Sequence, residues 1–162
     1  MEQYFPVLRN CPLFKAIPHE DLPGLIQCLG GRLAHFRKNE TIFSEGDCAR
    51  FFGIVCSGEV QVVRVDYYGN RTIVGHVEAP NLFGEAFACA ETETLPVSVV
   101  ASEDSEILLL DCRRITNPCG KGCGFHHKVI FNLLKIVAMK NILFNQRAEI
   151  ISKRTTREKL LA

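Results

Sequence analysis

The spacing of hydrophobic and polar positions divides the chain into three regions. From Tyr4 to Leu29, apolar residues recur at the three- and four-residue spacing of a helix, until Gly30-Gly31 ends the pattern. From residue 32 to 110, the spacing of apolar residues changes to the two-residue period of strands. From 125 to 151, the helical period returns. The pattern therefore predicts short N-terminal helices (1–31), a β region (32–116), and a linker followed by one long helix (117–151).

The β region consists of short strands between turn signals. Glu45-Gly46-Asp47, Ser57-Gly58 and Gly69-Asn70 are typical turn sequences. Seven or eight short strands at regular spacing, with few helices between them, favour a sandwich or a jelly roll. The predicted strands are 33–36, 41–43, 51–56, 60–65, 72–77, 97–101 and 107–110.

The predicted long helix has an apolar face that is too wide to lie on one surface only. One side of such a helix contacts its own barrel and the other contacts a twin helix, whereas a core helix of a monomer is the alternative interpretation. We expect a homodimer. One apolar stripe consists of Val129, Leu133, Ile136 and Leu143, and the adjacent stripe of Ile130, Leu134, Val137 and Phe144. The predicted dimer interface comprises Val129, Ile130, Leu133, Leu134, Val137 and Phe144.

Composition and charge narrow the class of protein. The 162 residues are 47% hydrophobic and carry a net charge of +1, as in an ordinary globular domain. We expect a cytoplasmic protein, because the sequence has no secretion signal and no apolar run long enough for a membrane helix. Without such a signal, most of the eight cysteines are expected to be apolar core residues. The six bases and two acids from 140 to 162 indicate either a segment facing nucleic acid or a solvated helix face.

Four short motifs occur in a characteristic order: Glu45-Gly46-Asp47, the segment 54–60 (IVCSGEV), the hairpin 66–70 (DYYGN) and the segment 81–86 (NLFGEA). Together they resemble the cyclic-nucleotide-binding jelly roll of the Crp/Fnr transcription regulators. The resemblance implies that 125–151 is a dimerisation helix and that 152–162 begins a helix-turn-helix domain for promoter DNA. We therefore expect the sensor and dimerisation part of a regulator, with the DNA-reading helix beyond Ala162.

The resemblance also places an effector pocket. In relatives that bind cyclic AMP, a Gly-Glu motif supplies a carboxylate to the ribose, and this corresponds to Gly84-Glu85; a structural carboxylate that caps backbone N–H groups is the alternative for Glu85. The phosphate of the nucleotide needs an arginine, but Leu95 and Pro96 occupy the positions of the family's Arg-Ser pair. Cyclic AMP is therefore disfavoured, the cofactor stays unknown, and either an apolar or aromatic effector or no ligand is expected. The predicted pocket residues are Phe83, Gly84, Glu85, Ala86, Phe87, Leu95, Pro96, Val97 and Ser98.

A glycine-rich segment with two thiols joins the β region to the long helix. Cys119 and Cys123 are four residues apart, and His126 and His127 follow them. Cysteine and histidine ligate zinc, iron–sulfur clusters or haem, so a metal or redox sensor at this junction is one hypothesis. A linker with incidental thiols is the other.

Two further classes of function fit the sequence less well. Cupin enzymes share the jelly roll, but they need a cluster of histidines and a carboxylate around a metal, and the strands supply only His35 and His76. A nucleotide-binding module of a kinase or channel would need the same phosphate-binding arginine. We therefore expect a binding module and not an enzyme.

Overall fold

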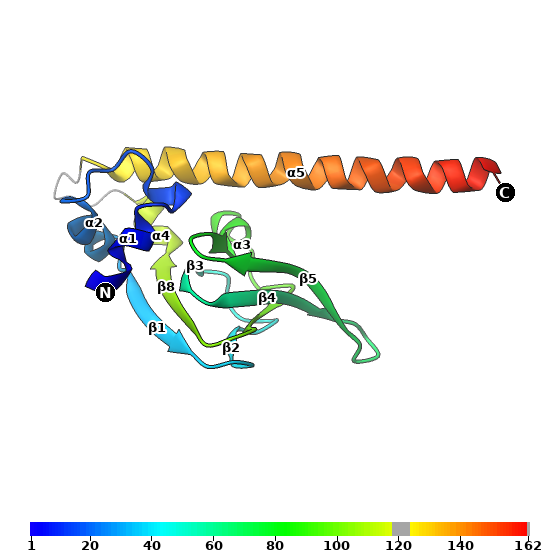
Figure 1. Cartoon of the computed structure of the whole chain (residues 1–162), viewed down its shortest axis with the longest axis horizontal. Helices are drawn as coiled ribbons and strands as arrows, with labels where there is room; N and C mark the ends of the chain where they lie inside the picture. Colours follow the sequence, from blue (N-terminus) through cyan, green and yellow to red (C-terminus); the bar gives the residue numbers. More distant parts are fainter. Residues whose placement is uncertain (118–123, 162) are drawn as a thin grey trace.

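Two four-stranded antiparallel sheets form the body of the protein. The computed structural model describes residues 1–117 and 124–161, and side chains up to residue 150. Figure 1 shows the sheets as a barrel-like sandwich below one long helix. We call the sheet whose outer face packs against helices the covered sheet; its strand order is β1 (Arg32–Phe36), β8 (Ser105–Asp111), β3 (Phe51–Ser57), β6 (Leu82–Phe83). We call the other the open sheet; its strand order is β2 (Thr41–Phe43), β7 (Ser98–Ala101), β4 (Glu59–Val65), β5 (Arg71–Glu78).

The central strands of the covered sheet, β8 and β3, are buried on both faces. Along β8, Ile107 and Leu109 point between the sheets, whereas Leu108 and Leu110 point toward the helices. Along β3, Val55 faces inward, while Ile54 and Cys56 face the helices. Because successive side chains alternate between two apolar environments, these strands appear in the sequence as unbroken apolar runs.

The open sheet reaches past the barrel as a hairpin of β4 and β5 (Figure 1). Its turn is closed by Asp66, whose carboxylate accepts hydrogen bonds from the N–H groups of Tyr68 and Asn70. The aromatic side chain of Tyr67 is 97% exposed, and Ile73 and Val74 on β5 are also exposed. The hairpin therefore presents apolar groups that the rest of the described chain leaves uncovered.

Short N-terminal helices cover the outer face of the covered sheet. These are η1 (Glu2–Tyr4), α1 (Phe5–Leu8), η2 (Pro12–Phe14) and α2 (Leu22–Cys28). At the end of α2, Gly30 takes a φ of 70° and donates to the carbonyl of Gln27, while Gly31 donates to Ile26. This Schellman arrangement confirms the predicted stop, because a left-handed residue is needed there.

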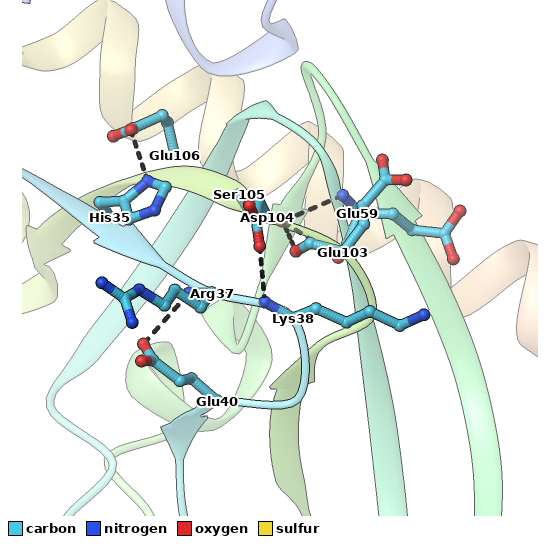
Figure 2. A network of polar contacts seen from close by, with 9 residues as sticks. All are labelled: His35, Arg37, Lys38, Glu40, Glu59, Glu103, Asp104, Ser105 and Glu106. Carbon is cyan, nitrogen blue, oxygen red and sulfur yellow. Dashed lines mark hydrogen bonds and ion pairs between the residues drawn. The ribbon is translucent and has the colours of Figure 1, made fainter.

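Polar contacts gather around the start of β8 (Figure 2). Ser105 is fully buried, and its hydroxyl contacts the carbonyl oxygens of Glu59 and Glu103 at 3.2 and 2.8 Å. The N–H of Lys38 donates to Asp104 at 2.9 Å. The contact between Ser105 and Glu59 joins β4 of the open sheet to β8 of the covered sheet, so it fixes the two sheets relative to each other at this place.

Helix α5 (His126–Leu161) is one continuous element that begins against the covered sheet's helices and ends far beyond the barrel (Figure 1). It extends past the predicted end at residue 151 because its sequence holds neither proline nor glycine. Asn132 anchors it by donating to the carbonyl oxygens of Leu13 and Lys15 at 2.9 and 3.0 Å. Within the described residues, no helix combines the length and the apolar character that a membrane crossing requires.

The predicted mainly-β fold with flanking helices is confirmed. The seven predicted strands all form, and their ends lie within two residues of the predicted ones. Three short elements were not predicted: β6, α3 (Glu85–Cys89) and α4 (Cys112–Thr116). Each has five residues or fewer, which is too short for a helical or a strand period to be recognised in the sequence.

Candidate functional site

The candidate site is the segment between β6 and β7, residues 82–98. Gly84 ends β6 with a φ of 78°, a left-handed conformation that glycine adopts without strain, and thereby starts α3. Phe83 pairs with Gly53 of β3. A Cβ on Gly53 would lie 2.2 Å from the Phe83 ring, so this glycine makes room for the aromatic side chain.

Glu85 is held by the long helix. Its side chain is only 3% exposed, and it forms an ion pair with the ammonium group of Lys140 on α5. Lys140 also donates to the carbonyl oxygen of Leu82 at 2.9 Å. A buried carboxylate needs a partner, and here the partner comes from 55 residues further along the chain.

The other predicted pocket residues divide between core and surface. Phe83 lies in the core between the sheets, with its ring centroid 5.7 Å from that of Phe43. Leu95 exchanges backbone hydrogen bonds with Gly46 and Asp47, both at 2.9 Å, and its side chain is buried. Of the rest, Val97 is buried, Gly84, Phe87 and Ser98 are half-buried, and Ala86 and Pro96 are exposed.

A groove that the sequence analysis missed runs between α5 and the barrel. It has a volume of about 310 Å³, and its walls combine apolar groups with three lysines. No spacing pattern in the sequence predicts this groove, because its walls come from three distant segments. They are formed by Pro12, Lys15, Asn81, Asn132, Lys135, Ile136, Met139, Lys140 and Leu143.

The two stripes of the long helix have different surroundings. Val129 and Leu133 pack into the chain's own core, against the N-terminal helices, and are therefore withdrawn from the dimer interface predicted above. Leu134 and Phe144 are 64% and 69% exposed. Ile130 and Val137 are half-buried at the edge of the core.

The predicted metal or redox residues Cys119 and Cys123 lie outside the described residues. Their neighbour His126 is buried, with Nε2 3.0 Å from the carbonyl oxygen of Arg114, and His127 is exposed. His35 and His76 lie at the surface, where their Nδ1 atoms form hydrogen bonds with the carboxylates of Glu106 and Glu59. Among the described residues, no three His, Cys, Asp or Glu side chains gather as a metal site would require.

The two sheets, the short helix after β6 and the long helix after β8 define a jelly-roll sensor domain. The family model of the cyclic nucleotide-binding domain matches residues 33–117, which is more than half of the chain. The chain belongs to this family, and the resemblance to the sensor domains of Crp/Fnr regulators is confirmed.

Individual relatives agree with this assignment. The cyclic AMP receptor protein of Thermus thermophilus is 29% identical over 103 residues, covering 64% of this chain and 46% of its own length. The chain thus spans about half of that curated relative. The crystal structure of the Thermus thermophilus catabolite activator protein superposes with a TM-score of 0.71 at 22% identity, covering 87% of this chain and 63% of its own. The sensor domain of the regulator DNR from Pseudomonas aeruginosa gives 0.69 at 20% identity, over 92% and 95%.

Proposed function

We propose that the chain is the effector-sensing and dimerisation part of a Crp/Fnr-type transcription regulator. It acts in the cytoplasm as a binding module without catalytic activity, and a DNA-binding domain follows it in the intact protein. An effector that binds one arrangement of α5 better than another shifts the population of the two arrangements. The movement of α5 then sets the position of the DNA-reading domains.

The ion pair between Glu85 and Lys140 carries this proposal. Glu85 belongs to the segment where relatives of this family are expected to bind their effector, and Lys140 belongs to the helix that leaves the barrel. A change in the segment 82–98 therefore acts directly on α5 through a buried carboxylate. The bond to Leu82 adds a second point of attachment for the same ammonium group.

The proposed dimer interface is one stripe of α5, in which Leu134 and Phe144 are exposed and Ile130 and Val137 are half-buried. Ile130, Leu134, Val137 and Phe144 follow one another at intervals of four, three and seven residues, which is the seam of a two-stranded coiled coil. Asn141 falls on this seam between Val137 and Phe144, where a polar residue fixes the register of such a pair. Val129 and Leu133 of the other stripe are already buried in the protomer. In this proposal α5 therefore packs on its own core on that side and on a second copy on the other.

The proposed effector carries no phosphate. The segment that approaches the sheet, residues 94–98, contains no base, and Glu91 and Glu93 beside it are exposed acids. A phosphate requires charge-assisted donors at this place. An apolar or aromatic molecule suits the buried side chains of Leu95 and Val97 better.

Hydrogen exchange on two matched variants tests the proposed coupling. In Lys140→Met the Glu85 carboxylate loses its partner, and we expect a loss of about 1 to 2 kcal/mol, which corresponds to roughly 5- to 30-fold faster amide exchange. The faster exchange should appear in both α3 and the middle of α5. Lys135→Met removes a charge from the same helix and groove, where Lys135 lies over the Phe131 ring, and should leave α3 unchanged.

Exchange that rises only around residue 140, with α3 unaffected, would contradict the coupling. Equal increases in amide exchange in Lys140→Met and Lys135→Met would contradict the coupling as well. Either result would leave the family assignment intact but would remove the route from the site to the helix.

A further inference from the structure

Two thiols meet where α3 and α4 pack together. Cys89 is the last residue of α3 and Cys112 is the first of α4, and their sulfur atoms are 3.7 Å apart. A disulfide bond is about 2.05 Å long, so the two sulfurs need a closing movement of less than about 2 Å, within reach of side-chain rotation. From the sequence, most of the eight cysteines were expected to be core residues, and the contact between these two was not predicted, since 23 residues separate them.

The two thiols differ in access to solvent. Cys89 is exposed, whereas Cys112 is buried in the core beneath it. A depression of about 200 Å³ lies beside them, with the adjacent residues Ala88 and Arg113 in its wall. A small reagent therefore reaches Cys89 first, and Cys112 stands behind it.

The contact also shifts the pKa values of the two thiols in opposite directions. The hydrogen bond from Cys112 lowers the pKa of Cys89 below its usual value, against the opposing effects of burial and the charge of Glu85. The same hydrogen bond, together with burial, raises the pKa of Cys112. By contrast, burial raises the pKa of Cys11 to about 12 and that of Cys56 to about 11, so these two core thiols are inert.

We propose that Cys89 and Cys112 are an oxidation site that forms a disulfide when the protein meets hydrogen peroxide. The Cys89 thiolate attacks one peroxide oxygen, the O–O bond breaks, and the hydroxide that leaves takes up a proton to become water. Cys89 is then a sulfenic acid. The Cys112 sulfur gives up its proton and attacks the Cys89 sulfur, and the sulfenic oxygen leaves as a second water. Two thiols are oxidised and one peroxide is reduced to two waters.

The bond would join two helices that hold α5. α3 carries Glu85, the partner of Lys140, and α4 packs against the first turns of α5. The disulfide therefore fixes both supports of α5 to each other. This inference rests on the sulfur contact and on the exposure of Cys89, and it goes beyond the proposed function, so it stands whether or not an effector binds.

Peptide mapping of the oxidised chain tests the proposal. The purified 162-residue chain is treated with an equimolar amount of hydrogen peroxide, its remaining thiols are alkylated, and the peptides are analysed without reduction. We expect a mass loss of two hydrogens and a peptide that joins Cys89 to Cys112. Cys89→Ser, a change at an exposed position, should lower the yield of any Cys112-linked peptide by at least about tenfold.

Two further variants distinguish the outcomes. Cys112→Ala keeps the core apolar and should leave a Cys89 sulfenic acid that dimedone captures. Cys48→Ser, at another exposed cysteine, should behave like the wild type. The proposal is overturned if wild-type Cys89 accumulates as sulfenic or sulfinic acid without the joined peptide, or if Cys89 links to Cys48 as readily as to Cys112.

Discussion

Asp111 shows how a single carboxylate organises the junction between β8 and α4. One oxygen accepts from the N–H of Arg113 at 3.0 Å and thus caps α4. The other accepts from Arg50 at 3.0 and 2.6 Å. Burial alone would raise the pKa of Asp111, but the bonds from Arg50 and Arg113 outweigh it and hold the pKa below its ordinary value of 3.8.

This shift predicts how the stability of the junction depends on pH. Because the folded pKa lies below the unfolded one, the carboxylate stabilises the fold above about pH 3.8 and loses that effect as the pH falls through the folded pKa. We expect Asp111→Asn to lower the free energy of unfolding by about 1 to 2 kcal/mol at neutral pH. Urea unfolding of both proteins at about pH 7 and about pH 3 should show the difference shrinking in acid. A difference that stays constant would contradict the assignment.

At the scale of elements, the segment from β6 to β7 is the proposed effector site. Its buried part is apolar, with Leu95 at the position that the family resemblance gives to a phosphate-binding arginine, and its carboxylate Glu85 is already paired with α5. The segment is also fixed to the 44–47 turn, since Ser98 accepts from the N–H of Glu45 at 2.9 Å. This arrangement favours an uncharged or apolar ligand over a nucleotide.

Thermal unfolding with cyclic AMP tests this view of the segment. A ligand at 100 times its dissociation constant stabilises a folded protein by about 2.7 kcal/mol, which shifts a melting temperature visibly. We expect no shift for this chain at millimolar cyclic AMP. The cyclic AMP receptor protein of Thermus thermophilus, measured in parallel, should be stabilised. A clear shift for this chain would show that another group replaces the missing arginine.

The same elements show which structural features could be predicted from the sequence. Ile107–Leu110 and Phe51–Cys56 were predictable as strands because their apolar runs are short and bounded by turns. The helix α3 was not, since five residues carry no periodic signal. The pairs Glu85–Lys140 and Cys89–Cys112 were out of reach for another reason: their members are 55 and 23 residues apart, and only the tertiary fold brings them together. Likewise, two equally apolar stripes on α5 gave no sign of which one the barrel covers.

At the scale of the whole molecule, the length of α5 is the dominant feature. The helix leaves the barrel after its contact at Lys140, and the described residues beyond it are exposed (Figure 1). A helix that is apolar and uncovered over several turns gains most of its stability from a packing partner. We propose that a second copy of α5 on the Leu134 side provides this partner, and that the pair of helices gives a common axis along which a signal from either barrel acts.

The mass of the chain in solution tests this account most directly. Native mass spectrometry and sedimentation at tens of micromolar should give twice the mass of one chain for the wild type. Leu134→Glu places a charge on the proposed seam and should yield a monomer. Met139→Glu places the same charge on the opposite, groove-lining side of α5, where the side chain is also exposed, and should remain a dimer. A monomeric wild type, or a Met139 variant that dissociates while the Leu134 variant does not, would contradict the proposed dimer and the signalling mechanism built on it.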